Sequence, residues 1–218
     1  MAVFPNEGYL AVGASPITIA ESKRLLRPDA LARRRLAGLE AGPTAGVAVR
    51  DHLLAALATL DGRGRRRVVS AYWPIDDELD VRPALVALAE RGYVCALPVV
   101  DAPGRPLLFR RWTLETPLRA AGFGLLEPDE SSPLFVPQLL LVPLLAFDGE
   151  GFRLGHGAAY YDRTLAALRL QGDVFAVGAG FATQEVAAVP REAHDQRLDA
   201  VVTEAGLRIF SARGIGAR

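Results

Sequence analysis

Hydrophobic residues recur at helical spacing near the start of the chain. Residues 21–39 alternate charged side chains with Leu and Ala, and their apolar positions fall on or near one face of a helix. Gly42 and Pro43 end this predicted helix, and a second helix is expected over 47–60. Residues 1–20 contain glycines and prolines that interrupt any such period, so we expect an irregular N-terminal extension there.

The pattern changes after residue 66, where short β-branched and aromatic runs alternate with helical stretches. Strands are predicted over 67–73, 93–100, 107–112, 139–143, 174–178 and 201–202, and further helices over 80–91 and 158–170. Such alternation indicates a sheet covered by helices on both faces. We therefore predict one α/β domain over residues 21–218, a three-layer α/β/α sandwich around a mixed, largely parallel sheet.

Three loops with unusual residues follow predicted strands. They span 73–80, 148–162 and 190–199. Ligands of open α/β sheets bind beyond the carboxyl ends of the strands. We therefore expect the functional site to be assembled from these three loops.

The composition narrows the class of protein. Half of the 218 residues are hydrophobic, and 25 basic side chains balance 25 acidic ones, which argues against a disordered chain and against a nucleic-acid binder with a basic surface. No apolar run reaches the roughly 20 residues of a membrane-spanning helix, and no secretory signal is visible. Cys95 is the only cysteine, so a multi-cysteine zinc site is excluded. We expect a cytoplasmic monomer or weak dimer with no nucleic-acid or membrane partner.

The common nucleotide-binding motifs are absent. The only lysine, Lys23, is followed by Arg24, so there is no Walker A loop. No Gly-x-Gly-x-x-Gly follows a predicted strand, and the fold is therefore expected to be Rossmann-like without the dinucleotide fingerprint. Lys23 and Arg27 lie four residues apart on one helix face. This pair is either a solvated basic face or a cationic clamp for a polyphosphate.

The loop 148–162 offers the clearest candidate chemistry. Gly155 and His156 lie just before a predicted helix, whose free N–H groups suit a phosphate, and glycine permits close backbone approach. Arg153 adds cationic reach, and Asp162 offers the kind of oxygen ligand that magnesium prefers. A plain glycine-rich turn before an amphipathic helix explains the same residues equally well.

The other two loops also allow two interpretations. Glu78 precedes a predicted helix, where acidic residues are common because they favour its dipole. Alternatively, it binds a ligand ring that carries N–H donors, beside the aromatic faces of Tyr72 or Trp73. Asp195 and Asp199 lie either in a solvated turn, the interpretation that the sequence favours, or at a metal ion.

Taken together, these residues resemble the 5-formyltetrahydrofolate cyclo-ligase family, also called 5,10-methenyltetrahydrofolate synthetases. The most specific element is the run 151–162, which is similar to the family's Arg-Leu-Gly-x-Gly-x-Gly-Tyr-Tyr-Asp motif. Supporting elements occur in the family's order over residues 21–205: Lys23-x-x-x-Arg27, Glu78-Leu79-Asp80, Gly122-Phe123-Gly124-Leu125-Leu126-Glu127-Pro128 and Asp195-x-x-x-Asp199.

The resemblance implies a reaction and a role for each matched residue. The expected reaction converts 5-formyltetrahydrofolate and ATP into 5,10-methenyltetrahydrofolate, ADP and phosphate with magnesium. The ATP site is expected at Lys23, Arg27, Arg153, Leu154, Gly155, His156, Gly157, Ala158, Ala159, Tyr160 and Tyr161, of which Arg153, Tyr160 and Tyr161 are the catalytic candidates. The folate site is expected at Tyr72, Trp73, Glu78, Phe123 and Tyr160, and the magnesium ligands are Asp162 and Asp195.

The chain departs from the family pattern at two positions. Ala159 stands where the family usually has a third glycine, and Ala158 where Gly or Lys is common. Alanine at 159 is strained if that residue needs a positive φ, and harmless if it begins the helix. Two alternatives remain: a non-catalytic folate- or nucleotide-binding regulator of the same fold, and a related ATP-dependent ligase for another heterocycle.

Overall fold

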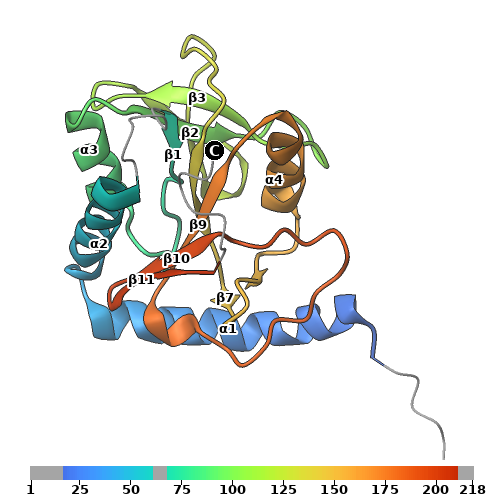
Figure 1. Cartoon of the computed structure of the whole chain (residues 1–218). Helices are drawn as coiled ribbons and strands as arrows, with labels where there is room; N and C mark the ends of the chain where they lie inside the picture. The colour runs from blue at the N-terminus through green and yellow to red at the C-terminus, as the bar shows by residue number, and fades with distance from the viewer. Residues whose placement is uncertain (1–16, 61–67, 211–218) are drawn as a thin grey trace, which may run out of the picture.

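A computed structural model describes residues 17–60 and 68–210. Its main sheet has seven strands in the order β11-β10-β9-β6-β1-β2-β3 (Figure 1). The five inner strands run parallel, whereas β11 and β3 pair antiparallel at the two edges. The predicted mixed, largely parallel α/β sheet is confirmed.

The elements alternate along the chain as the sequence pattern predicts. The α-helices are α1 (Ile19–Ala41), α2 (Ala45–Leu60), α3 (Arg82–Glu90) and α4 (Tyr160–Gln171), and the 3₁₀ helices are η1 (Gly122–Gly124) and η2 (Ala182–Gln184). The main sheet contains β1 (Val68–Ser70), β2 (Val94–Val99), β3 (Leu108–Trp112), β6 (Leu139–Pro143), β9 (Phe175–Ala179), β10 (Ala200–Thr203) and β11 (Gly206–Ile209). Two small hairpin sheets pair β4 (Leu118–Ala120) with β5 (Leu126–Pro128) and β7 (Ala146–Phe147) with β8 (Arg153–Leu154).

Helices cover both faces of the sheet (Figure 1). On one face α2 and α3 pack against the strands, and Val49 and Leu85 are fully buried there. On the other face α4 buries Leu165 against Leu140 and Val142 of β6. Removing this apolar surface from water is the main force that holds the three layers together.

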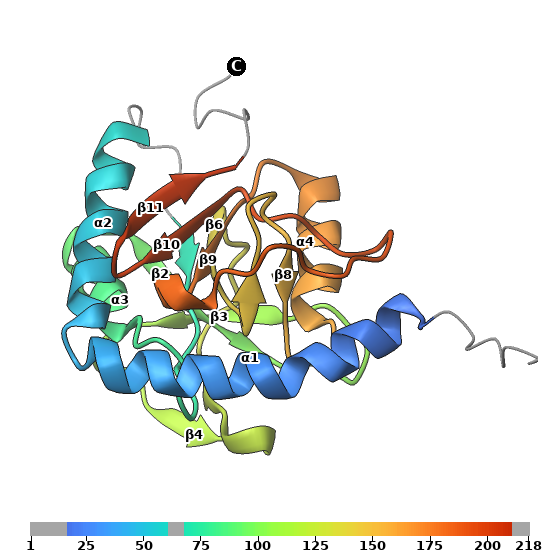
Figure 2. The ribbon, with the colours of Figure 1, turned by 90° about the horizontal axis from the view of Figure 1, so that it is seen from below.

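The topology fixes where a ligand site can form. β1 pairs with β2 on one side and with β6 on the other, so the order of the parallel strands reverses between β1 and β6. Ligands of open α/β sheets bind at the carboxyl ends of the strands at such a reversal. Helix α1 crosses the molecule at this end, as the view from below shows (Figure 2).

The helix and strand boundaries agree with the sequence pattern to within a few residues. β6 spans the predicted range 139–143, and Gly42, with φ +64°, ends α1 as expected. Helix α1 begins at Ile19 rather than at residue 21, because Thr18 Oγ1 accepts a hydrogen bond from Glu21 N at 3.2 Å and so caps it. Residues 1–16 of the predicted extension lie outside the described residues.

Candidate functional site

One face of α1 carries the cations of the candidate site. Lys23, Arg27 and Arg34 are spaced by four and seven residues, which places them on the same side of a helix. Lys23 and Arg34 are buried, with 7% and 1% of their surface exposed, and Ala30 and Ala37 lie buried on the same face. These three cations contact the loops that follow β1, β8 and β9.

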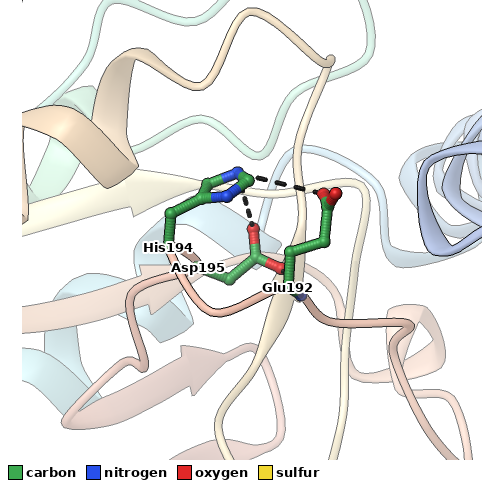
Figure 3. A group of neighbouring side chains, drawn as sticks. All are labelled: Glu192, His194 and Asp195. Atoms are coloured by element: carbon green, nitrogen blue, oxygen red, sulfur yellow. Dashed lines mark hydrogen bonds and ion pairs between the residues drawn. The ribbon is translucent and has the colours of Figure 1, made fainter.

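Lys23 binds the loop 190–199. Its Nζ donates hydrogen bonds to Asp195 Oδ2 at 2.5 Å and to Glu192 Oε2 at 3.0 Å. Burial by itself lowers the pKa of Lys23, but the hydrogen bonds and negative charges of Asp195 and Glu192 outweigh it and raise that pKa. Within the described ranges, Glu192, His194 and Asp195 form the one group of possible metal-ligand atoms that lie within 4.8 Å of one another (Figure 3).

Arg27 joins α1 to the glycine-rich loop. Its Nε donates to Gly155 O at 3.0 Å, and its two terminal nitrogens form no hydrogen bond or ion pair with the part of the chain that is described. Four of its five N–H donors therefore remain for a ligand. Gly157 has φ +108°, and a Cβ placed there would lie 3.2 Å from Arg27 Cζ, so this position favours glycine for two reasons.

The N-terminus of α4 has no side-chain cap. Ala159 precedes the helix in the left-handed region, with φ 51° and ψ 27°, so the backbone at this position has the positive φ that strains alanine. Gly157 and Ala158 are exposed. The first-turn N–H groups and the positive end of the helix dipole thus lie beside an open loop, which is a favourable place for a phosphate.

Arg153 and Asp162 form a second anchor between the loops. Arg153 Nη2 donates to Asp162 Oδ1 at 2.9 Å, and its Nη1 donates to Gln196 O at 2.7 Å. Asp162 Oδ1 also accepts from Gln196 N at 2.9 Å. Gln196 directly follows Asp195, so the structure brings the segments of both predicted metal residues side by side. The guanidinium of Arg153, whose side chain is only 4% exposed, holds these segments together.

Leu154, which is expected at the ATP site, has a buried side chain. It is 1% exposed and packs with Ala30, Leu145 and Val189 in a satellite core under α1. Its side chain is apolar and fills this core, so only its backbone remains for ligand binding. The backbone carbonyl already accepts a hydrogen bond from Leu145 N at 2.8 Å.

The side chain of Glu78 is 6% exposed and lies in the loop that follows the carboxyl end of β1. Its Oε2 accepts from Ile75 N at 3.1 Å, while Oε1 lies 3.7 Å from both Arg34 Nη1 and His156 Nε2. Burial, and secondarily the negative charge of Glu78, raises the pKa of Tyr161. Glu78 thus lies where the loop 73–80, α1 and the glycine-rich loop meet.

The predicted aromatic residues lie in three different environments. Tyr72 is buried, its hydroxyl donates to Leu79 O at 2.9 Å, and burial raises its pKa well above the usual value. Trp73 is half-buried against Trp112, with ring centroids 6.3 Å apart, and so packs partly against the core. Tyr160 is half-buried at the start of α4. Phe123 lies in η1, and its side chain is outside the described part of the structure.

Sequence reasoning missed Arg34 and left Asp199 undecided. Arg34 lies between Arg33 and Arg35, and a run of three arginines gives no local sign that only the middle one is buried. The available signal was its helical phase, seven residues after Arg27. Asp199 is structural, because its Oδ2 accepts from Ala176 N at 2.8 Å and from Arg169 Nη2 at 3.1 Å.

Comparisons with known proteins bear on the family of this chain. Residues 19–204 match the model of the 5-formyltetrahydrofolate cyclo-ligase family. A 5-formyltetrahydrofolate cyclo-ligase of Mycolicibacterium smegmatis is 38% identical over 148 residues, covering 63% of this chain and 73% of that protein. The 5-formyltetrahydrofolate cyclo-ligase of Haemophilus influenzae is 32% identical over 132 residues, covering 58% of this chain and 70% of that protein.

A solved structure gives the same result for the fold. The 5,10-methenyltetrahydrofolate synthetase of Aquifex aeolicus superimposes with a TM-score of 0.68 at 27% identity, covering 90% of this chain and 97% of that one. Among the described helices, none is long and apolar enough to cross a membrane. By its family match, its relatives and its fold, the chain belongs to the 5-formyltetrahydrofolate cyclo-ligase family of ligases.

Proposed function

We propose that this protein converts 5-formyltetrahydrofolate and ATP into 5,10-methenyltetrahydrofolate, ADP and phosphate. The observation that carries the proposal is the meeting of the cationic face of α1 with the glycine-rich loop and the uncapped start of α4. Toward the described residues, Arg27 leaves four of its N–H donors unused there. Lys23 uses two of its three donors on carboxylates and keeps one for a phosphate oxygen.

The chemistry explains why such a site is needed. The N5-formyl group is amide-like, so its carbon is a poor electrophile and its oxygen a poor leaving group. The formyl oxygen attacks the γ-phosphorus, and the bond from that phosphorus to ADP breaks. N10 then attacks the activated carbon and loses its proton, and the ring closes as phosphate leaves. Such phosphoryl transfer depends on positioning and on positive charge rather than on a protein nucleophile.

The protein residues bind and orient the two substrates in this scheme. Arg27, Lys23 and the N–H groups of the loop 155–159 hold the phosphates, and the buried Arg153 keeps that loop in register. Glu78 binds N–H donors of the pterin ring through Oε1, because Oε2 is occupied by Ile75 N. Catalytic roles for Arg153, Tyr160 and Tyr161 remain proposals.

The acidic residues fit a magnesium ion that is shared with the phosphates. Asp162 and Asp195 lie on adjacent segments. In the described chain, Asp162 Oδ2 and Asp195 Oδ1 accept no hydrogen bond, so each residue keeps one oxygen for a cation. Magnesium prefers one or two carboxylates together with phosphate oxygens. When bound, it neutralises charge on the phosphoryl group that is transferred.

The deciding experiment measures methenyl-folate formation by absorbance with purified protein, ATP, magnesium and 5-formyltetrahydrofolate. We expect turnover that requires all components. Asp162→Asn keeps an oxygen for Arg153 and Gln196 but removes the charge, and we expect it to lose at least about 100-fold in kcat, because the metal ligands support the charged transition state. Asp101→Asn, at an exposed acid, is the matched control and should turn over normally.

The left-handed Ala159 is the observation that favours the alternative of a binding protein without catalysis, because it departs from the family's glycine. Ligand-induced stabilisation without turnover would support that alternative. ATP binding with no response to 5-formyltetrahydrofolate would instead indicate a ligase for another heterocycle. A cytoplasmic location and a monomeric or weakly dimeric state stay predictions.

A further inference from the structure

Arg34 is an unusual residue for the interior of a protein. Its side chain is 2% exposed, yet in the described structure its charge has only a long ion pair with one carboxylate. The nearest carboxylate oxygen, Glu78 Oε1, lies 3.7 Å from Nη1, and Nε is buried without a hydrogen-bond partner. A buried charge with weak compensation costs stability, so folding alone does not explain this residue.

The two neighbours of Arg34 lie in a different environment. Arg33 and Arg35 are exposed, and they contact Glu185 O and Asp77 Oδ2 at 3.3 Å. Only the middle residue of the three points into the site. The contrast also provides two matched control positions, one residue away on either side.

Arg34, Glu78 and His156 form a closed triangle of polar atoms. Arg34 Nη1 lies 3.4 Å from His156 Nε2, and Glu78 Oε1 lies 3.7 Å from each of these nitrogens. The side chains become more exposed in one direction: 2% for Arg34, 6% for Glu78 and 47% for His156. His156 therefore covers the outer side of a buried pair.

The triangle joins two substrate-binding parts of the site. Glu78 belongs to the proposed folate site, and His156 lies between Gly155 and Gly157 in the proposed phosphate loop. Because Arg34 Nη1 contacts both side chains, a shift of one is transmitted to the other. Arg34 is too deeply buried to contact either substrate, so it acts through its two neighbours.

We propose that Arg34 is a positioning residue that orients Glu78 for the folate and couples folate binding to ATP binding through His156. The inference rests on the proposed function. Phosphates that bind the loop draw His156 away from Glu78 Oε1 and leave that oxygen to the pterin ring. Arg34 then remains as the cation that balances and orients Glu78. ATP therefore tightens the binding of 5-formyltetrahydrofolate.

The test is isothermal titration of the full chain with 5-formyltetrahydrofolate, with and without a saturating non-hydrolysable ATP analogue and magnesium. In the unmodified protein we expect the analogue to tighten folate binding by about 10-fold, within the usual range of coupling between sites. In Arg34→Met this tightening should fall below about 2-fold. Folate binding should weaken by about 10-fold, while the analogue alone should bind within about 3-fold of normal.

Arg33→Met and Arg35→Met should keep both the affinity and the coupling. Arg34→Lys keeps the charge but loses the forked geometry, so we expect an intermediate folate affinity; it also serves as the test variant if Arg34→Met does not fold. Normal coupling in a folded Arg34 variant overturns the inference, as does an equal loss in the Arg33 and Arg35 variants. An unmodified protein that binds both ligands without turnover refutes the proposed catalysis, but these titrations still decide the role of Arg34.

Discussion

Replacing Ala159 with glycine tests whether the backbone before α4 is strained. Ala159 has φ 51° and ψ 27°, and apart from Asp76 it is the only described residue other than glycine with a positive φ. Asp tolerates this region because its side chain can bond locally, whereas alanine has no such compensation. Glycine adopts the same conformation without a steric penalty.

The expected change in the free energy of unfolding follows from two opposing effects. The left-handed conformation costs an L-residue about 1–2 kcal/mol. Glycine loses more conformational entropy on folding than alanine does, which costs about 0.5–1 kcal/mol. The difference predicts that Ala159→Gly raises the free energy of unfolding by about 0.5–1 kcal/mol. For a chain of this size, that gain corresponds to an increase of roughly 1–4 °C in Tm.

Urea unfolding followed by circular dichroism measures this difference directly. Ala167→Gly is the matched control, because Ala167 lies inside the same helix in an ordinary helical conformation. We expect the control to lose about 1 kcal/mol, the usual cost of glycine in a helix interior. The two substitutions are chemically identical, so a difference in sign between them reports the backbone conformation alone.

The reasoning fails if Ala159→Gly destabilises the protein as much as Ala167→Gly does. That outcome would mean that residue 159 is not held at a positive φ in solution. A gain in stability with unchanged turnover would show that the alanine affects folding rather than catalysis. A gain in both would mean that the strain also displaces the phosphate loop.

Two further predictions concern the glycine-rich loop and the core. Gly157→Ala should lower the free energy of unfolding by about 1–2 kcal/mol and weaken ATP binding in a titration, because residue 157 has a positive φ and the new Cβ would lie 3.2 Å from Arg27 Cζ. Gly155→Ala is the control: its Cβ would meet nothing within 4 Å, so we expect neither stability nor ATP binding to change. Burial raises the pKa of Cys95 from 9.0 to about 12, so above pH 9 the unfolded chain loses a proton that the folded chain keeps. The free energy of unfolding should therefore fall by up to ~1.4 kcal/mol per pH unit towards pH 12, and Cys95→Ala should remove this component in urea titrations at each pH.

The sheet was predictable because its strands bury continuous apolar runs. Residues 139–143 are apolar throughout, which is typical of a parallel strand that is covered on both faces, and they form β6 as predicted. Strands β7 and β8 have two residues each, and β11 has four, of which Arg208 and Ile209 are exposed. These elements pair with neighbours that are close in sequence, but two to four residues are too few for local periodicity to indicate a strand.

The contacts between the loops were harder to predict than the identity of the candidate site residues. The glycine-rich run and the α1 cations stood out by type and spacing, and the structure brings them into contact. Trp73 packs partly on Trp112, a residue 39 positions away that no local pattern connects to it. Asp195 and Asp199 looked equivalent, yet one meets Lys23 and the other meets Arg169, because an irregular segment does not keep side chains on one face.

The inward face of α1 argues for a bound anion independently of any family likeness. Ala30 and Ala37 pack into the apolar clusters and hold the helix close to the sheet. Lys23 and Arg34 are buried on the same stripe, where apolar residues of similar volume would be neutral or stabilising. Lys23 is balanced by two carboxylates, whereas among the described residues Arg34 has one carboxylate at 3.7 Å and Arg27 has only a backbone carbonyl. A polyphosphate beside Arg27 would supply the negative charge that this part of the face lacks, while Arg34 stays paired with Glu78 beneath it, so the bound anion gives the face a reason to keep cations at a cost to folding.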